Sequence, residues 1–303
     1  MTDRPSPPQS ERTGVADGPQ LGAGRPVAPF GRRLCEVTRN TDSGGYRIFS
    51  ALDPGGPEPA AGQFYMLATE AGWDGEGGRP YLARAFSVAD AERTEGGVRL
   101  DFLVQAVGPG TARLAALRAG EGLWVTGPLG RPFSAPRELV PGAAGAILVG
   151  GGIGVAPLAI WRRRLLAAGV PARVLLGFRD RANSGGLSLF DCSEIRLASE
   201  DGHAGHRGYV TDLLTVLLEG DEARSAAVYA CGPPAMLEAV RALCAERGVG
   251  CELAMEAPMA CGFGACMGCA VPLAGGSYMR LCLDGPVVRG EQIETALVPG
   301  SGH

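Results

Sequence analysis

The chain has 303 residues, of which 46% are hydrophobic and 20% are charged, and its formal net charge is −4. This length is sufficient for two or three domains with cores of their own, and the composition is that of an ordinary globular protein. Because the net charge is negative and no basic run stands out, the sequence lacks the electrostatic features that binding to nucleic acid or to an anionic membrane requires.

The N-terminal residues are rich in proline, glycine, serine and charge, which predicts a disordered tail over 1–30. The tail contains no apolar segment of the kind that a secretory signal needs, so we expect a cytoplasmic protein. The apolar stretch 143–161 contains five glycines and Pro157. This composition argues against a membrane-spanning helix and favours a buried strand, a glycine loop and the start of a helix.

Residues 31–137 carry short apolar or alternating runs that are bounded by glycine and proline, the pattern of a β-rich domain. One face of the run VRLDFLVQAVG is apolar throughout: Val98, Leu100, Phe102 and Val104. This period of two predicts a half-buried strand. Many such strands with turns between them favour a closed antiparallel barrel.

Two motifs in the predicted barrel suggest a ligand. In RAFS, residues 84–87, Arg84 could pair with a pyrophosphate while Phe86 and Ser87 contact an aromatic ring system. In VGPGTARLAAL, glycines and Thr111 stand directly before an amphipathic helix, whose N-terminus favours a phosphate. Each motif alone is also compatible with a plain strand or a plain capped turn. Together in one barrel, they favour a flavin site.

From 138 to 252 strands alternate with helices, which predicts a parallel sheet built from βαβ units. The loop LVGGGIGVAP follows one strand and opens a helix, and YACGPPAM does the same further along the chain. Because open α/β sheets bind ligands at the carboxyl ends of their strands, the two loops predict a nucleotide site. Cys231 in the second loop is either a small buried hydrophobe or a neighbour of a nicotinamide ring.

Two polar loops of this region leave questions open. His203 and His206 lie in a glycine-rich loop, and we expect them to face solvent rather than to hold a metal. In GFRDRANSGG, Asp180 would repel the 2′-phosphate of NADP, whereas Arg179 and Arg181 would attract it. The sequence therefore does not separate NAD from NADP.

Four of the nine cysteines lie close together, separated by four, two and twelve residues: Cys261, Cys266, Cys269 and Cys282. A disulfide knot is disfavoured in a reducing compartment. Structural zinc sites usually use two separate ligand pairs, whereas here three cysteines form one group and the fourth stands alone. The spacing is that of plant-type [2Fe–2S] ligands, and small residues between the cysteines let backbone N–H groups reach the sulfurs. We therefore predict a small cluster domain with little regular structure.

In chain order, RAFS, GPGT, GPLGRPF, GGGIGVAP and ACGPPAM resemble the ferredoxin–NAD(P)H reductase superfamily. With MACGFGACMGCAV and YMRLCLDGPV added, the chain resembles the electron transfer subunits of dihydroorotate dehydrogenase over about 31–290. The resemblance implies a β plus α/β fold: an FAD-binding antiparallel barrel over 31–137, an NAD-binding domain over 138–252 and a [2Fe–2S] domain over 253–303. It also implies an FMN-containing catalytic partner, assembled with this chain as a heterotetramer in pyrimidine biosynthesis.

Carried over by position, the resemblance implies three sets of contacts. The expected FAD contacts are Arg84, Ala85, Phe86, Ser87, Leu103, Val104, Gln105, Gly110 and Thr111. The expected NAD contacts are Gly151, Gly152, Gly154, Cys231, Gly232 and Pro233. The expected cluster ligands are Cys261, Cys266, Cys269 and Cys282. The chain departs from the family pattern at Ala85, where proline is frequent, and at Gln105, where a basic residue is frequent. The second departure weakens one phosphate contact.

These cofactors together suggest a function. A nicotinamide exchanges a hydride and a [2Fe–2S] cluster exchanges one electron, so a flavin belongs between them, and no side chain of this chain need transfer protons. The three predicted domains leave no room for a substrate-oxidising barrel of about 250 residues, so we expect that chemistry on the partner chain. The expected function is electron transfer from the partner's FMN through the cluster and FAD to NAD⁺.

Two alternatives to this function stay open. The chain could be the small subunit of an electron-bifurcating ferredoxin–NADP reductase or of a sulfhydrogenase, which it also resembles in layout. It could instead be a zinc-stabilised nucleotide-binding sensor with no redox role.

Overall fold

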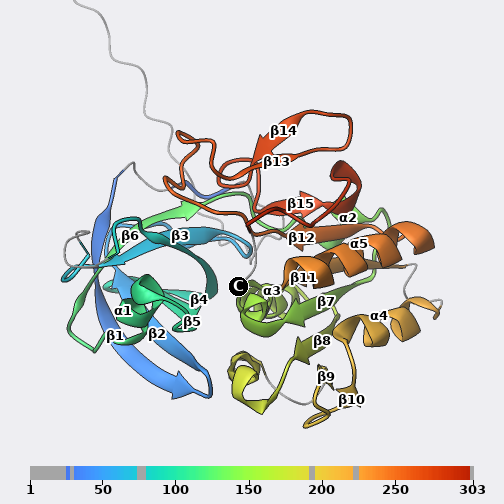
Figure 1. The fold of residues 1–303 in the computed structure, drawn as a ribbon, viewed down its shortest axis with the longest axis horizontal. Coiled ribbons are helices and arrows are strands. Elements are labelled where there is room, and N and C mark those ends of the chain that lie inside the picture. Colours follow the sequence, from blue (N-terminus) through green and yellow to red (C-terminus); the bar gives the residue numbers. More distant parts are fainter. Residues whose placement is uncertain (1–24, 28–30, 74–79, 191–194, 221–224, 301–303) are drawn as a thin grey trace, which may run out of the picture.

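The computed structural model describes residues 25–27, 31–73, 80–190, 195–220 and 225–300. A β-barrel and an α/β unit lie side by side, and the C-terminal segment crosses above them in the view of Figure 1. The predicted disordered tail lies outside the described residues except for 25–27. There, Arg25 Nη1 donates a hydrogen bond to the carbonyl oxygen of Leu283 (3.2 Å). This short piece therefore lies against the body of the protein.

Six strands close the barrel in the order β1-β2-β5-β4-β3-β6, and all neighbouring pairs are antiparallel. The strands are β1 (Arg33–Ser43), β2 (Tyr46–Asp53), β3 (Phe64–Thr69), β4 (Arg84–Thr94), β5 (Gly97–Val104) and β6 (Gly122–Leu129). Helix α1 (Pro109–Ala115) lies between β5 and β6 in the chain. The predicted antiparallel barrel is confirmed.

Two strands of the barrel differ from the sequence-based expectation. The sequence does not predict β1, because only two of its side chains, Cys35 and Val37, are buried and the rest are mostly polar. Strand β5 was expected to be half-buried, but this is wrong near its end, where Leu103 on the second face is only 1% exposed. A Cβ placed on Gly186 would lie 3.2 Å from Leu103 Cδ2. The second face is therefore covered by the α/β unit rather than by solvent.

The α/β unit contains a seven-stranded sheet in the order β10-β9-β8-β7-β11-β12-β15. Neighbouring strands are parallel except β12 and β15, which are antiparallel. The strands are β7 (Gly145–Gly151), β8 (Ala172–Phe178), β9 (Ile195–Ser199), β10 (His206–Arg207), β11 (Ala226–Cys231), β12 (Cys251–Ala254) and β15 (Val287–Arg289). The helices are α2 (Pro136–Leu139), α3 (Ala156–Ala167), α4 (Val210–Leu218) and α5 (Pro234–Arg247). The predicted parallel sheet is confirmed. Among the described residues, no helix is both long and apolar enough to cross a membrane.

Helix α3 packs between the sheet and the barrel. Its Arg163 forms an ion pair with Asp90 of β4 and donates a hydrogen bond to the carbonyl oxygen of Ala91 (2.5 Å). Its Trp161 stacks on Phe133, with ring centroids 5.8 Å apart. Because these apolar side chains belong to one buried cluster that also contains barrel residues, the barrel and the α/β unit form one continuous core.

The C-terminal segment is built from short strands. β13 (Ala270–Pro272) and β14 (Tyr278–Arg280) form an antiparallel hairpin. The chain then returns, and β15 pairs with β12 at the edge of the large sheet. The sequence predicts neither this return nor the strand β12, which crosses the expected domain limit at 252. The limits at 137 and 252 stay predictions.

Candidate functional site

The two predicted flavin motifs lie against each other. Arg84 begins β4, and its guanidinium packs on the first turn of α1, because a Cβ at Gly110 would lie 2.9 Å from Arg84 Nε. The same guanidinium lies 5.8 Å from the centroid of the Trp73 ring and donates a hydrogen bond to the carbonyl oxygen of Leu82. A guanidinium beside a helix start is a suitable place for a phosphate.

The hydroxyl of Thr111 orders the loop before α1. It accepts hydrogen bonds from the backbone N–H groups of Val107 (2.9 Å) and Gly108 (3.0 Å). Trp73 Nε1 is buried and has no hydrogen-bond partner among the described residues. A buried donor of this kind next to Arg84 is expected where a ligand supplies the acceptor. The residues present therefore fit a flavin with its pyrophosphate.

The other predicted flavin residues differ in what they can offer. On β4, Ala85 is exposed, whereas Phe86 and Ser87 are half-buried. Leu103 and Val104 are buried in the core, so only their backbone can face a ligand. Gln105 follows them, and its Nε2 donates a hydrogen bond to Asn183 Oδ1 (3.1 Å) in the α/β unit.

The two predicted nucleotide loops meet at the carboxyl ends of β7 and β11. These strands are neighbours although β8, β9 and β10 separate them in the chain, so the order of the strands changes direction here. A Cβ at Gly154 would lie 2.5 Å from Gly232 Cα, and one at Gly151 would lie 2.6 Å from Met236 Sδ. Backbone thus meets backbone at Gly154, and the side chain of Met236 packs on Gly151. The point where the strand order of an open α/β sheet reverses is a common ligand site, and glycines there leave room for a nucleotide phosphate.

The remaining predicted NAD residues lie around these glycines. Gly152 begins the 3₁₀ turn η2 (Gly152–Val155), which leads into α3. Pro233 is exposed and precedes helix α5. Cys231 is buried, and this burial, followed by the nearby Glu256 carboxylate, raises the pKa of its thiol. A protonated buried thiol is suited to packing against a ring and not to nucleophilic attack.

The loop after β8 carries the residues that bear on NAD or NADP. Hydrogen bonds from the side chain and the backbone N–H of Asn183 hold the pKa of Asp180 below its ordinary value. Arg179 Nε donates to the same carboxylate (3.2 Å). A charged Asp180 at this strand end opposes a 2′-phosphate.

The two histidines bind neighbouring carboxylates. His203 Nδ1 lies 2.7 Å from Asp201 Oδ1, and His206 Nε2 lies 3.1 Å from Asp212 Oδ2. The side chain of His206 is 44% exposed, as predicted, but that of His203 is 15% exposed. The expectation of a solvent-facing side chain is therefore wrong for His203, because Asp201 draws it into the turn.

The four predicted cluster ligands lie in one loop system as two pairs. Cys269 and Cys282 are buried, with their Sγ atoms 3.3 Å apart. The thiols of Cys261 and Cys266 are joined by a hydrogen bond, and Cys266 is exposed. All eight cysteines of the described residues are free thiols. Within the described ranges, no three His, Cys, Asp or Glu side chains converge on a position where they could hold one metal ion. The two cysteine pairs therefore do not surround a common centre.

Backbone N–H groups point at these sulfurs. Burial opposes ionisation of Cys261, but hydrogen bonds from the N–H groups of Phe263, Cys266 and Ala265 and from the Cys266 thiol lower its pKa to about 6. Gly268 N lies 3.5 Å from Cys266 Sγ. Four thiols with N–H donors around them, and no histidine in the segment, fit an iron–sulfur cluster better than zinc.

The cysteine loop packs on the barrel next to the flavin motif. Gly262 has φ +76°, and a Cβ there would lie 2.5 Å from Met66 Cγ. Met66 belongs to β3 and is the register partner of Ala85 in β4. On its other side, the loop is held by Arg280, whose Nη1 donates to the carbonyl oxygen of Gly264 (3.1 Å). The cysteines therefore lie one strand away from the RAFS motif.

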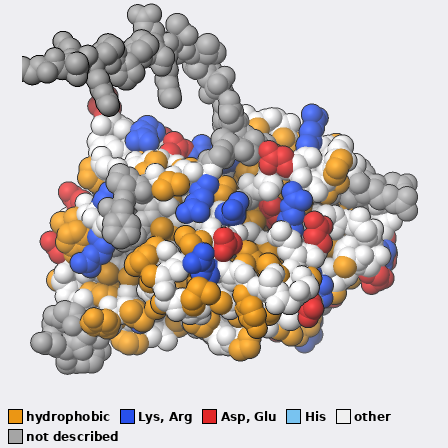
Figure 2. Space-filling view, turned by 90° about the horizontal axis from the view of Figure 1, so that it is seen from above, with side chains coloured by type: hydrophobic (Ala, Val, Ile, Leu, Met, Phe, Trp, Pro, Cys, Tyr) orange, Lys and Arg blue, Asp and Glu red, His pale blue; other side chains and the backbone are white. Residues whose placement is uncertain are grey.

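The C-terminal segment also presents apolar side chains. Phe263, Met267 and Tyr278 are 45%, 53% and 70% exposed. Figure 2, seen from the side of this segment, shows hydrophobic side chains interspersed with arginines and carboxylates. Apolar side chains surrounded by charge are typical of protein interfaces.

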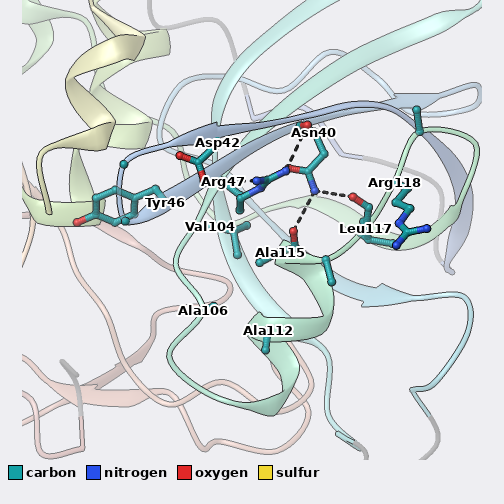
Figure 3. Close-up of a pocket in the computed structure, with 14 residues that line it drawn as sticks. Asn40, Asp42, Tyr46, Arg47, Val104, Ala106, Ala112, Ala115, Leu117 and Arg118 are labelled. Atoms are coloured by element: carbon teal, nitrogen blue, oxygen red, sulfur yellow. Dashed lines mark hydrogen bonds and ion pairs between the residues drawn. The ribbon is translucent and has the colours of Figure 1, made fainter. Parts of the chain in front are cut away.

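A pocket of about 650 Å³ lies between the β1–β2 hairpin and α1. Figure 3 shows Asn40 reaching from β1 to the end of this helix, where its Nδ2 donates to the carbonyl oxygens of Ala115 (3.1 Å) and Leu117 (2.6 Å). Arg47 Nε donates to the other amide atom of Asn40 (2.9 Å). Of the predicted flavin contacts, only Val104 lines the pocket. The pocket therefore flanks the candidate flavin site and does not contain it.

Comparisons with known proteins find a family model for the cysteine segment and relatives for most of the chain. Residues 256–294 match the family model described as the iron–sulfur cluster binding domain of dihydroorotate dehydrogenase B. The electron transfer subunit of dihydroorotate dehydrogenase B (NAD⁺) from Caldanaerobacter subterraneus is 33% identical over 242 residues, which are 78% of this chain and 88% of that protein. The subunit of the same name from Bacillus caldolyticus is 36% identical over 238 residues, which are 77% of this chain and 86% of that protein.

Solved structures share the fold. An NADH-dependent reduced ferredoxin-NADP oxidoreductase, studied for flavin-based electron bifurcation, superposes with a TM-score of 0.71 at 26% identity, over 88% of this chain and 92% of that one. A ferredoxin NADP⁺ reductase from Neisseria gonorrhoeae with bound FAD and NADP has a TM-score of 0.57 at 17% identity, over 72% of this chain and 92% of that one. The second likeness concerns the fold alone.

Proposed function

The chain belongs to the family of electron transfer subunits of dihydroorotate dehydrogenase B, and we propose that it passes electrons from a partner's FMN through a [2Fe–2S] cluster and FAD to NAD⁺. It is then a subunit of an NAD-dependent oxidoreductase complex of pyrimidine biosynthesis, with dihydroorotate oxidised on the partner chain. The observation that carries this function is the adjacency of the three sites. The cysteine loop packs on β3, RAFS lies on the next strand, and α3 joins the glycine loop to that strand.

Cys261, Cys266, Cys269 and Cys282 are the proposed cluster ligands. Their role is supported by the free thiols, by the N–H donors around the sulfurs and by the family match of the segment. The glycines between them let the loop approach both the sulfurs and the barrel. Because a cluster requires reduced thiols, we also place the protein in the cytoplasm.

Arg84 is the proposed partner of the FAD pyrophosphate, together with Gly110 and Thr111 at the start of α1. Ala85 to Ser87 would lie along the flavin, and Leu103 to Gln105 would contribute backbone. Gly151, Gly152, Gly154 and Cys231 to Pro233 would hold NAD at the switch point. When bound, a flavin exchanges a hydride with a nicotinamide and single electrons with a cluster. The chain's own part is to hold the groups at fixed positions and to exclude water.

The partner surface is proposed to include the exposed apolar side chains of the cluster segment. Phe263 and Met267 lie next to the exposed Cys266, so a chain that docks there would come close to the cluster. An FMN-containing catalytic chain that covers this face, with two copies of each chain, would give the heterotetramer.

Co-expression with the dihydroorotate dehydrogenase of the same organism tests this function. We expect a complex that survives size-exclusion chromatography and reduces NAD⁺ with dihydroorotate, whereas neither chain does so alone. Failure to form the complex, with no dihydroorotate-dependent reduction of NAD⁺, would contradict the proposal.

A second function has one specific observation in its favour. The similarity to the bifurcating ferredoxin-NADP oxidoreductase covers nearly all of both chains. If the chain belongs to such a complex, reduced ferredoxin together with NADH would reduce NADP⁺, and dihydroorotate would have no effect. The carboxylate of Asp180 at the start of the loop after β8 opposes a 2′-phosphate and so favours NAD and the first function.

A further inference from the structure

The segment 181–189 lies between the barrel and the glycine loop. It contains the 3₁₀ turns η3 (Arg181–Asn183) and η4 (Gly185–Leu189) and follows β8. In Figure 1 it is the yellow-green coil beside the tip of the β1–β2 hairpin. None of the proposed cofactor contacts lies in this segment, yet it contacts both the proposed flavin strand and the proposed nucleotide loop.

On the barrel side the segment is bonded through its backbone carbonyl groups. Gly45 N donates to the carbonyl oxygen of Ala182 (2.7 Å), and Ser43 Oγ donates to the carbonyl oxygen of Gly185 (2.8 Å). A Cβ at Gly185 would lie 1.6 Å from the carbonyl oxygen of Ser43. The segment therefore cannot move toward the hairpin, and these bonds resist movement away from it.

On the nucleotide side the contact is apolar. A Cβ at Gly186 would lie 2.5 Å from Val155 Cγ2 of the glycine loop and 3.2 Å from Leu103 Cδ2 of β5. One residue of the segment thus contacts both the proposed nucleotide loop and the proposed flavin strand.

A chain of side-chain hydrogen bonds joins the flavin strand to this segment and to the end of β8. Gln105 Nε2, at the end of the flavin strand, donates to Asn183 Oδ1 (3.1 Å). Asn183 Nδ2 in turn donates to Asp180 Oδ1 (2.7 Å), and the backbone N–H of Asn183 donates to the same atom (3.0 Å). The amide of Asn183 is thereby fixed in one orientation, with its oxygen directed at Gln105.

We propose that Gln105 and Asn183 are positioning residues for hydride transfer: their hydrogen bond fixes the segment 181–189, which packs on the glycine loop through Gly186, against the flavin strand. The proposal rests on the function proposed above. The hydride carries two electrons and one proton from the dihydronicotinamide to the flavin, and a second proton comes from solvent, so these two amides exchange no proton. Their effect is on the distance and angle between the nicotinamide and flavin rings. The rate of hydride transfer is sensitive to changes of about 1 Å in this geometry.

The test uses the full chain with its cofactors and the variants Gln105→Met, Asn183→Ala and the double variant. Methionine matches glutamine in length but has no donor. Ser184→Ala is the control, because the hydrogen bond from Ser184 Oγ to the carbonyl oxygen of Arg181 (2.8 Å) lies within the segment. FAD and iron content, NADH affinity and the rate constant of flavin bleaching by NADH are measured by stopped flow, and amide hydrogen exchange is followed over 181–189.

Each single variant should keep its FAD and bind NADH within about twofold of the wild type, and bleach roughly five- to tenfold more slowly. The double variant should be no slower than the slower single variant, because both remove one interaction. Exchange at 181–189 should rise in all three and stay unchanged in Ser184→Ala.

Wild-type bleaching rates in both single variants would overturn the proposal, as would two rate effects that multiply in the double variant. Loss of FAD in Gln105→Met with unchanged behaviour of Asn183→Ala would also overturn it, since Gln105 would then act only as a flavin contact. If the wild-type chain binds no FAD, or if NADH does not bleach its bound flavin, the proposed function itself is contradicted.

Discussion

At the junction of the two predicted nucleotide loops, where β7 and β11 end, glycines stand where backbone meets backbone, and a Cβ at Gly154 would lie 2.5 Å from Gly232 Cα. In the cysteine loop, Cys266 and Met267 are instead exposed, and the loop is held by local bonds such as that from Arg280 to Gly264. The geometry of the junction thus depends on close packing, whereas the role proposed for the loop depends on its thiols. Substitutions should therefore act by strain at the junction and by loss of a ligand in the loop.

Removing a thiol should have the largest effect. Cys282→Ser should abolish the cluster, with loss of about two irons per chain and of the cluster absorption, because Cys282 is one of the four proposed ligands. The flavin should still be bleached by NADH, since the junction is untouched. Iron and sulfide assays together with stopped-flow bleaching check both statements.

The matched control is Cys244→Ala, a buried cysteine of α5 outside the loop, which should keep its iron. Iron retained in Cys282→Ser, or a flavin that NADH no longer reduces, would remove the distinction between the two regions.

Adding one methyl group at the junction should have the next largest effect. Gly154→Ala forces a Cβ against the backbone of Gly232, so the nucleotide loop must shift at a cost of about 1–3 kcal/mol. We expect NADH affinity to fall roughly 10- to 100-fold, while iron and FAD content stay unchanged. Gly220→Ala, where the nearest atom to the new Cβ is 3.5 Å away, should bind NADH like the wild type. Equal affinities in both variants would show that the close approach does not matter.

Arg84→Ala should weaken FAD binding. A charged hydrogen bond to phosphate contributes about 1.5–3 kcal/mol, which corresponds to roughly 10- to 150-fold in affinity. FAD release during dialysis, followed by fluorescence, measures the effect, and Arg93→Ala at the exposed far end of β4 is the control. Full FAD retention in Arg84→Ala would show that the pyrophosphate binds elsewhere.

The smallest expected effect concerns the link between the two units. Tyr229 of β11 donates its hydroxyl hydrogen bond to the carbonyl oxygen of Ser134 (2.8 Å) in the segment that joins them. Tyr229→Phe should lower the free energy of unfolding by about 1 kcal/mol and leave the cluster intact. Urea denaturation measures the change, with Tyr81→Phe, 80% exposed, as the control. A loss of iron in Tyr229→Phe would mean that the two regions are coupled.

Local motifs explain how much of this site could be predicted. RAFS, the glycine loop and the cysteine spacing each carry their chemistry within a few residues, and the structure brings Arg84 to Gly110 and Gly154 to Gly232. What could not be predicted depends on contacts distant in the chain. The polar strand β1 forms because β2 and β6 flank it, and β15 joins the sheet after a long return.

Contacts between single side chains that are distant in the chain could not be predicted from the sequence either. Trp73 lies beside Arg84, and Gln105 binds Asn183 across 78 positions of the chain. Neither contact has a local pattern, because tryptophan, glutamine and asparagine occur in many surroundings. The sequence shows that Gln105 departs from the family pattern, but it does not show that Asn183 is its hydrogen-bond partner.

The most direct measurement is the visible absorption spectrum of the purified chain, with iron, sulfide, zinc and flavin assayed on the same sample. The electron-transfer account predicts about two irons, two sulfides and one FAD per chain, with the flavin bleached by NADH. A colourless chain with bound zinc and no flavin would contradict it, and would support the zinc-stabilised nucleotide-binding sensor instead.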